Sequence, residues 1–180
     1  MKINSLAAFC GAKKGNNKLY SQHANEIGIM MAQNNVSLIY GGGYKGIMGA
    51  IADAVMKNGG KVTGIIPEVI LEWEQQHKGI TELIIVKDMH VRKKTMYDLC
   101  DAALVLPGGF GTLDEFFEML TWNQLSIHDK QLFIMNTDGF YDHLIKHIYQ
   151  LERNEFLYEP VNKRIKVIKE PAELLPFLQS

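Results

Sequence analysis

The stretch AALVLPGGFGTLDEFFEML, residues 102–120, joins a short apolar run to three glycines and then to a helical pattern. Leu113, Phe116, Phe117 and Leu120 follow one another at i, i+3, i+4 and i+7, which is typical of one apolar helix face. Glycines before a helix start let a ligand approach main-chain N–H groups, and the positive end of the helix favours an anion there. The stretch therefore predicts a strand, a ligand-binding loop and a helix, in that order.

Six further apolar runs alternate with segments of helical period. Because the runs are almost continuously apolar, they predict a parallel sheet of about seven strands with helices on both faces, an α/β fold. A length of 180 residues fits a single domain spanning residues 1–180. Residues 67–81 stay unassigned, because they are too polar for a core and too long for a tight turn. The predicted strands are residues 3–10, 36–40, 61–66, 82–86, 102–106, 131–136 and 164–168, and the predicted helices are 17–34, 46–58, 88–100, 112–126, 138–153 and a short closing helix.

The charge balance indicates a small-molecule partner. The 19 Lys and Arg residues nearly match the 20 Asp and Glu residues, so we expect no basic surface for nucleic acid or for an anionic membrane. No window is apolar over the 18 or so residues that a membrane span needs, and we expect a cytoplasmic protein. Cys10 and Cys100 are too far apart for a metal knuckle or a redox pair, which predicts two buried thiols and no metal site.

A first glycine loop follows the predicted strand 36–40. Gly41, Gly43 and Gly46 satisfy the pattern G-x-G-x-x-G, which brings backbone N–H groups and a helix N-terminus to a phosphate. The same glycines can serve only a tight turn and close helix packing, and both interpretations stay open.

Two further groups of polar residues lie near the predicted edge of the sheet. Glu115 follows the second glycine loop, where it could face a ligand or complete a capping box with Thr112. Asp88 can cap a helix whose opening turns carry four basic residues, either as a solvated face or as an anion-binding cluster. These four residues are His90, Arg92, Lys93 and Lys94.

Four motifs together resemble the LONELY GUY (LOG) family of cytokinin riboside 5′-monophosphate phosphoribohydrolases. PGGFGTLDE matches the family signature P-G-G-x-G-T-x-x-E, and FCGAKKG, YGGGYKGIMG and DMHVRK fall in the family's order and spacing, from about residue 4 to residue 168. The resemblance implies a Rossmann-like, doubly wound homodimer. It also implies hydrolysis of the N-glycosidic bond of AMP or an N6-substituted AMP to free base and ribose 5-phosphate, without a metal or an organic cofactor.

The resemblance also implies roles for individual residues. Arg92 and Glu115 match the catalytic pair of the family. One departure from its pattern is Ala12-Lys13-Lys14, where the family usually places small hydroxyl residues. The two lysines could strengthen phosphate binding or mark an altered substrate preference, so the departure concerns the substrate rather than the reaction. The implied substrate contacts are Glu74, Met89, Lys93, Gly109, Phe110, Gly111, Thr112 and Thr121, with Gly42 and Gly43 on the phosphate side.

Three other functions compete with the hydrolase interpretation. A non-catalytic nucleotide-binding or carrier protein of the same fold is the main alternative, because fold does not determine function. A pyridoxal-dependent decarboxylase, which an older label of the family suggests, needs a Schiff-base lysine and a partner for the ring nitrogen, and the sequence identifies no such pair. A dinucleotide oxidoreductase rests only on the glycines of the first loop.

Overall fold

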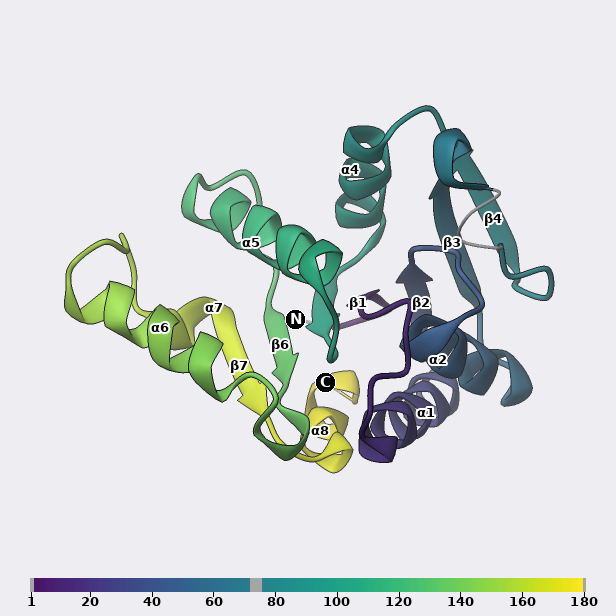
Figure 1. Ribbon diagram of the computed structural model, residues 1–180, viewed down its shortest axis with the longest axis horizontal. Coiled ribbons are helices and arrows are strands. Elements are labelled where there is room, and N and C mark those ends of the chain that lie inside the picture. Colours follow the sequence, from purple (N-terminus) through teal and green to yellow (C-terminus); the bar gives the residue numbers. More distant parts are fainter. Residues whose placement is uncertain (1, 72–75, 180) are drawn as a thin grey trace.

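The computed structural model describes residues 2–71 and 76–179, and its seven strands form one sheet in which every neighbouring pair is parallel (Figure 1). The strand order is β4-β3-β2-β1-β5-β6-β7. Each of the seven predicted runs corresponds to one strand, with β3 reaching one residue beyond its predicted end, which confirms the predicted sheet. The strands are β1 (Ser5–Phe9), β2 (Ser37–Tyr40), β3 (Val62–Pro67), β4 (Glu82–Val86), β5 (Ala102–Val105), β6 (Leu132–Met135) and β7 (Ile165–Ile168).

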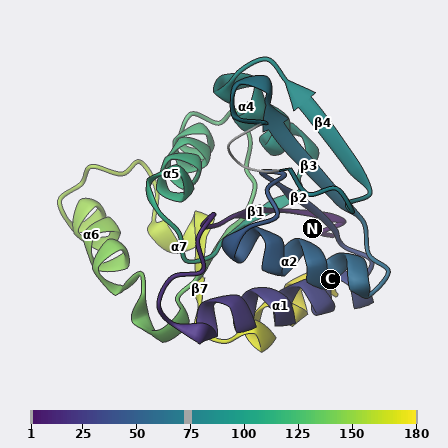
Figure 2. The ribbon, with the colours of Figure 1, turned by 45° about the vertical axis from the view of Figure 1, so that its right-hand side comes forward.

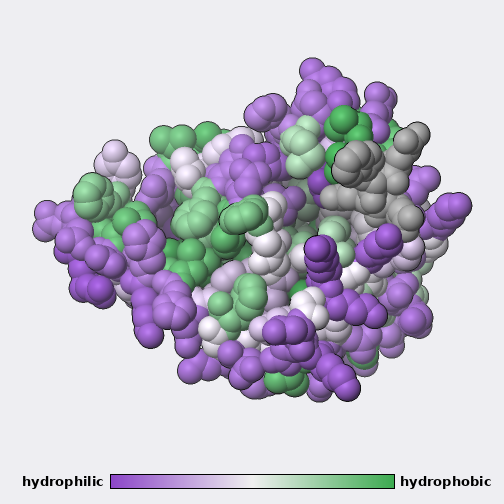
Figure 3. All heavy atoms as spheres, viewed as in Figure 1, coloured by the Kyte–Doolittle hydropathy of each residue, from purple (hydrophilic) through white to green (hydrophobic). Residues whose placement is uncertain are grey.

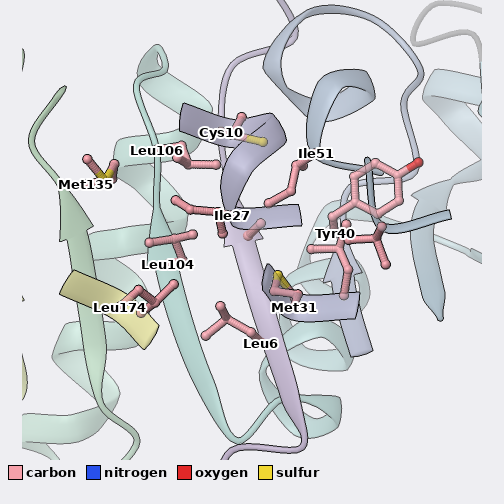
Figure 4. Close-up of a cluster of buried hydrophobic side chains, with 14 of the residues drawn as sticks. Leu6, Cys10, Ile27, Met31, Tyr40, Ile51, Leu104, Leu106, Met135 and Leu174 are labelled. Carbon is pink, nitrogen blue, oxygen red and sulfur yellow. The ribbon is translucent and has the colours of Figure 1, made fainter. Parts of the chain in front are cut away.

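Helices cover both faces of the sheet, as predicted (Figure 2). Because side chains alternate along a strand, β1 sends Leu6 into one core and Phe9 into the other. In the first core, Ile27 and Ile51 point from two helices toward the sheet (Figure 4). The first face carries α1 (Lys18–Gln33), α2 (Gly46–Lys57), η3 (Pro171–Leu174) and α8 (Leu175–Leu178), and the second carries α4 (Met89–Leu99), α5 (Phe110–Gln124), α6 (Asp142–Arg153) and α7 (Val161–Arg164).

The strand order reverses between β1 and β5, which makes the fold doubly wound. The chain builds β1, β2, β3 and β4 outward in one direction and then returns to place β5 on the other side of β1. In open parallel sheets, ligands bind outside the carboxyl ends of the strands at such a reversal. Both glycine loops and the start of α4 lie at these strand ends, so the topology brings the predicted site residues to one edge of the sheet.

Some helix ends follow the sequence prediction and others do not. Asp88 caps α4, since its Oδ1 accepts a hydrogen bond of 2.8 Å from the backbone N–H of Val91. The predicted stop after α2 is confirmed, and Gly59 there has a φ of +77°. By contrast, α5 begins at Phe110, two residues before the predicted start at Thr112. The helix predicted from residue 138 begins only at Asp142, because a 3-10 turn, η2 (Thr137–Gly139), with a positive φ at Asp138 precedes it.

The segment that the sequence leaves unassigned is partly irregular. A 3-10 turn, η1 (Glu68–Ile70), follows β3 directly, and Gln76 forms an antiparallel bridge with Gly43. In the part of the chain that the structure describes, no helix combines the length and the apolar character needed to cross a membrane. Cys10 and Cys100 are both free and buried, as predicted.

Candidate active site

A cleft of about 360 Å³ lies at the reversal of strand order, outside the carboxyl ends of β1, β2 and β5. Four segments that are far apart in the sequence meet there: the loop after β1, the loop after β2, the start of α4 and the start of α5. The described residues that line the cleft are Ala8, Cys10, Gly11, Ala12, Gly41, Met48, Ile70, Met89, Arg92, Gly109, Gly111, Thr112, Asp114 and Glu115.

The N-terminus of α2 is closed by the chain itself. The carbonyl oxygen of Gly11 accepts hydrogen bonds from the backbone N–H groups of Ile47 at 3.0 Å and Met48 at 3.3 Å. Gly46 has a φ of +66°, and a Cβ at this position would lie 2.3 Å from the carbonyl carbon of Ala12. The geometry therefore favours the packing interpretation of the first glycine loop over the phosphate interpretation.

The N-terminus of α5 opens into the cleft. Gly109 is its N-cap, and among the described residues no side chain caps the helix. A Cβ on Gly109 or on Gly111 would meet no described atom within 4 Å, so both glycines present bare backbone to the space in front of the helix. The first N–H groups of a helix have no intrahelical partner, and the helix dipole adds positive potential there. This end of the cleft is therefore suited to a phosphate.

Arg92 reaches the cleft from the first turn of α4. Its side chain is buried, and Nη2 donates a hydrogen bond of 3.1 Å to the carbonyl oxygen of Gly41. Nη1 lies 3.7 Å from the sulfur of Met89, one turn away on the same helix. Because a guanidinium stays protonated at neutral pH, Arg92 places a permanent positive charge in the cleft.

Glu115 lies in the second turn of α5 and lines the cleft. A capping box with Thr112 would need Thr112 at the N-cap. That interpretation is wrong, because Gly109 is the N-cap and Thr112 already lies inside the helix. A side chain in the second turn of α5 that faces the cleft can instead contact a ligand whose anionic end lies at the helix start.

The thiol of Cys10 lies within the electrostatic reach of both predicted catalytic residues. Burial raises the pKa of this thiol far above its usual range, the carboxylate of Glu115 raises it further, and the guanidinium of Arg92 lowers it. The two opposite charges therefore act on one buried atom at the end of β1. The structure thus places Arg92 and Glu115 at one cleft.

Comparison with known proteins decides the family. Residues 48–178 match a family model described as possible lysine decarboxylase. A cytokinin riboside 5′-monophosphate phosphoribohydrolase of Rhodococcoides fascians is 40% identical over 92% of this chain and 84% of its own length. A relative of the same name from Arabidopsis thaliana is 38% identical over 97% of this chain and 81% of its own length. The chain belongs to the LOG family.

Solved structures show the fold in more distant proteins. The molybdenum cofactor binding protein from Rippkaea orientalis has a TM-score of 0.74, with 17% identity over 99% of this chain and 97% of that chain. The Moco carrier protein from Chlamydomonas reinhardtii has a TM-score of 0.73, with 15% identity over 98% of this chain and 94% of that chain. At such low identity the likeness concerns the fold alone.

The cleft brings together about half of the residues that the LOG resemblance implies. Glu74 lies outside the described residues. Gly42 and Gly43 do not line the cleft, and Phe110 is 94% exposed at the start of α5. The implied residues that line the cleft are Met89, Arg92, Gly109, Gly111, Thr112 and Glu115.

Lys93 and Thr121 lie elsewhere. The ammonium group of Lys93 forms ion pairs with Asp114 at 3.1 Å and Glu118 at 3.0 Å. Thr121 donates a hydrogen bond of 2.7 Å to the carbonyl oxygen of Phe117 and lies in a groove between α5 and α6. Within this chain, the structure therefore brings neither side chain to the lining of the cleft.

Sequence reasoning missed other lining residues. Cys10 directly follows a strand and Met48 lies in the first turn of a helix, so each looks like an ordinary core residue in the sequence. Asp114 carries a signal, since it precedes Glu115 within the family signature. Among the described residues, no group of three or more His, Cys, Asp or Glu side chains is placed to hold a metal ion.

A second hollow of about 290 Å³ adjoins the cleft, and Gly11, Ala12 and Gly109 line both. Lys13 lines this hollow, and the rings of Tyr20 and Phe140, which also line it, meet edge to face at 5.4 Å. The chain's departure from the LOG pattern therefore lies beside the uncapped start of α5.

Proposed function

We propose that this protein hydrolyses the N-glycosidic bond of AMP or an N6-substituted AMP. One water molecule is consumed, and free base and ribose 5-phosphate are released. The observation that carries the proposal is that Arg92 and Glu115 share one cleft with the uncapped N-terminus of α5. The names of relatives that are 38–40% identical over most of the chain support the same reaction.

The 5′-phosphate binds at the start of α5. The N–H groups around Gly109 and Gly111 meet its oxygens, and the helix dipole favours its charge. This contact is remote from the bond that breaks, so its binding energy holds the ribose in place for the reaction. Met89, Met48 and Ile70 offer apolar surface in the same cleft, which suits a purine ring.

Glu115 acts on the reacting carbon. As the bond between ribose and purine breaks, the sugar gains oxocarbenium character and negative charge moves onto the base. The carboxylate stabilises that cation and takes a proton from the attacking water, a contribution of about a hundredfold to ten-thousandfold for general-base work. Arg92 cannot donate a proton at neutral pH, so it binds phosphate or sugar oxygens and orients Glu115.

The protein is proposed to act as a cytoplasmic homodimer. Apolar residues gather over α5 and beside α6 (Figure 3), and Phe117 and Leu120 line a groove of about 200 Å³ there. Exposed apolar grooves of this kind suit contact between protein surfaces. Thr121 lies in the same groove, so a substrate contact by Thr121 would be made across the dimer.

The test is to follow release of free base from AMP, from N6-isopentenyl AMP and from adenosine by chromatography. Base release from the nucleotides, with very slow release from adenosine, supports a hydrolase that needs the 5′-phosphate. Comparable turnover of adenosine and AMP contradicts the phosphate site at α5. Binding of a nucleotide without any release supports the carrier alternative instead.

A further inference from the structure

Lys93 and Asp114 are the direct sequence neighbours of Arg92 and Glu115, and they bind each other. The Nζ of Lys93 lies 3.1 Å from Oδ2 of Asp114, and the Lys93 side chain is 10% exposed. Successive residues of an α-helix point about 100° apart. Lys93 therefore faces α5 while Arg92 faces the cleft, and Glu115 faces the cleft beside Asp114.

The ammonium group of Lys93 contacts two carboxylates of α5. It has three N–H donors, and three carboxylate oxygens surround it: Oδ1 of Asp114 at 3.3 Å, Oδ2 at 3.1 Å and Oε2 of Glu118 at 3.0 Å. Burial lowers the pKa of Lys93, but hydrogen bonds to Glu118 and Asp114 outweigh it, so the pKa is raised. Lys93 is therefore charged and held by two carboxylates of α5.

The contacts continue to the backbone of Glu115. The hydroxyl oxygen of Tyr97 lies 2.9 Å from Oε2 of Glu118 and 3.1 Å from the carbonyl oxygen of Glu115. The Tyr97 ring is fully buried and packs edge to face against Trp122 at 5.2 Å. The side chains of α4 thus hold both the acidic face of α5 and the peptide group of Glu115.

We propose that Lys93, Glu118 and Tyr97 are positioning residues that brace α4 against α5 and so set the placement of Arg92 relative to Glu115. On this account Lys93 does not touch the substrate. The test of this proposal by kcat rests on the proposed hydrolysis, whereas its test by thermal unfolding does not.

The first test compares Lys93→Met with Lys94→Met. Lys94 is a matched control, because it is the next residue of α4 and pairs with Asp98 on the same helix. If Lys93 braces the two helices, Lys93→Met misplaces Glu115 and lowers kcat about a hundredfold, with little change in KM for AMP. Lys94→Met changes neither kcat nor KM. Affinity for ribose 5-phosphate, measured by calorimetry, stays at the wild-type value. A Lys93→Met variant with normal kcat and strongly weakened ribose 5-phosphate binding overturns the proposal.

The second test is rescue. Lys93→Met leaves the carboxylate of Glu118 without its cation, so adding Glu118→Gln restores part of the lost kcat and of the thermal stability. Glu118 does not line the cleft, so this rescue cannot come from a lost substrate contact. If the fold-loss of kcat in the double variant equals the product of the fold-losses in the two single variants, the brace is overturned.

Two further measurements keep the proposal testable. If Lys93→Met does not fold, Tyr97→Phe removes only one hydroxyl, and a brace then predicts a lower kcat at constant KM, whereas an unchanged kcat overturns it. If wild type releases no base, the proposed function fails, but coupling between Lys93→Met and Glu118→Gln in thermal unfolding still tests the brace.

Discussion

The guanidinium of Arg92 and the backbone of Gly41 fit together without space for a side chain. Nη2 of Arg92 donates to the Gly41 carbonyl oxygen at 3.1 Å, and a Cβ on Gly41 would lie 2.2 Å from the same nitrogen. Gly41, directly after β2, therefore leaves room for the guanidinium of Arg92, which lies on α4 and is 51 residues further along the chain.

Gly41→Ala is expected to displace Arg92 while the sheet stays folded. A shift of about 1 Å in a positioned group can cost about a hundredfold in rate, so kcat for base release should fall by that order. Steady-state kinetics with AMP, alongside circular dichroism, measures the effect. Wild-type kcat in the folded variant would show that the Arg92 position does not matter for turnover.

Gly111→Ala and Gly108→Ala separate binding from folding. A Cβ on Gly111 enters open space before α5, so this variant keeps its stability, or gains up to about 1 kcal/mol from helix propensity, while KM for AMP rises. A Cβ on Gly108 would lie 2.1 Å from Oγ1 of Thr112, so Gly108→Ala lowers the unfolding temperature. Thermal unfolding and steady-state kinetics check both. An unchanged KM in Gly111→Ala would place the phosphate elsewhere.

Lys13→Ala is expected to weaken nucleotide binding, whereas Lys14→Ala is not. Lys13 lines the hollow beside the α5 N-terminus, and the described lining does not include Lys14. Loss of one contact to a charged phosphate is worth about tenfold in KM, and added salt should reduce the difference between the variants. Equal KM values for both variants and wild type would contradict a role for Lys13 in recognition.

The cap at Asp88 predicts a pH dependence of stability. The hydrogen bond from the Val91 N–H holds the pKa of Asp88 below its ordinary value. A carboxylate with a depressed pKa stabilises the fold above its unfolded pKa, and this contribution is lost as the pH falls through the folded pKa. Asp88→Ala should therefore lower the unfolding temperature at pH 7, and its deficit should shrink below about pH 4. Asp88→Asn, which can still cap, is the control.

The sheet was predictable largely because its inner strands are buried on both faces. All four residues of β5 and of β6 are buried, and such continuous apolar runs stand out against the amphipathic helices between them. The start of α5 was not predictable in the same way. Gly109 caps that helix without a side chain, whereas Thr112 resembles a cap in the sequence, so the pattern favoured a start two residues too late.

The different roles of Arg92 and Lys93 could not be read from the sequence. Both are buried charges on a helix that lacks a clear apolar side, and their partners lie far along the chain at Gly41 and Asp114. A family signature indicates which residue types occur at such positions, but not which way their side chains face. Only the packing of α4 against α5 shows which cation faces the cleft and which one joins the helices.

The most direct test of the account is the rate of base release from AMP by Glu115→Gln, with affinity for AMP measured in parallel. The substitution removes the charge and proton affinity of the carboxylate while keeping its size. We predict that the rate falls about a hundredfold to ten-thousandfold while AMP still binds at the start of α5. Base release at the wild-type rate by this variant would contradict the assignment of Glu115 as the group that activates water.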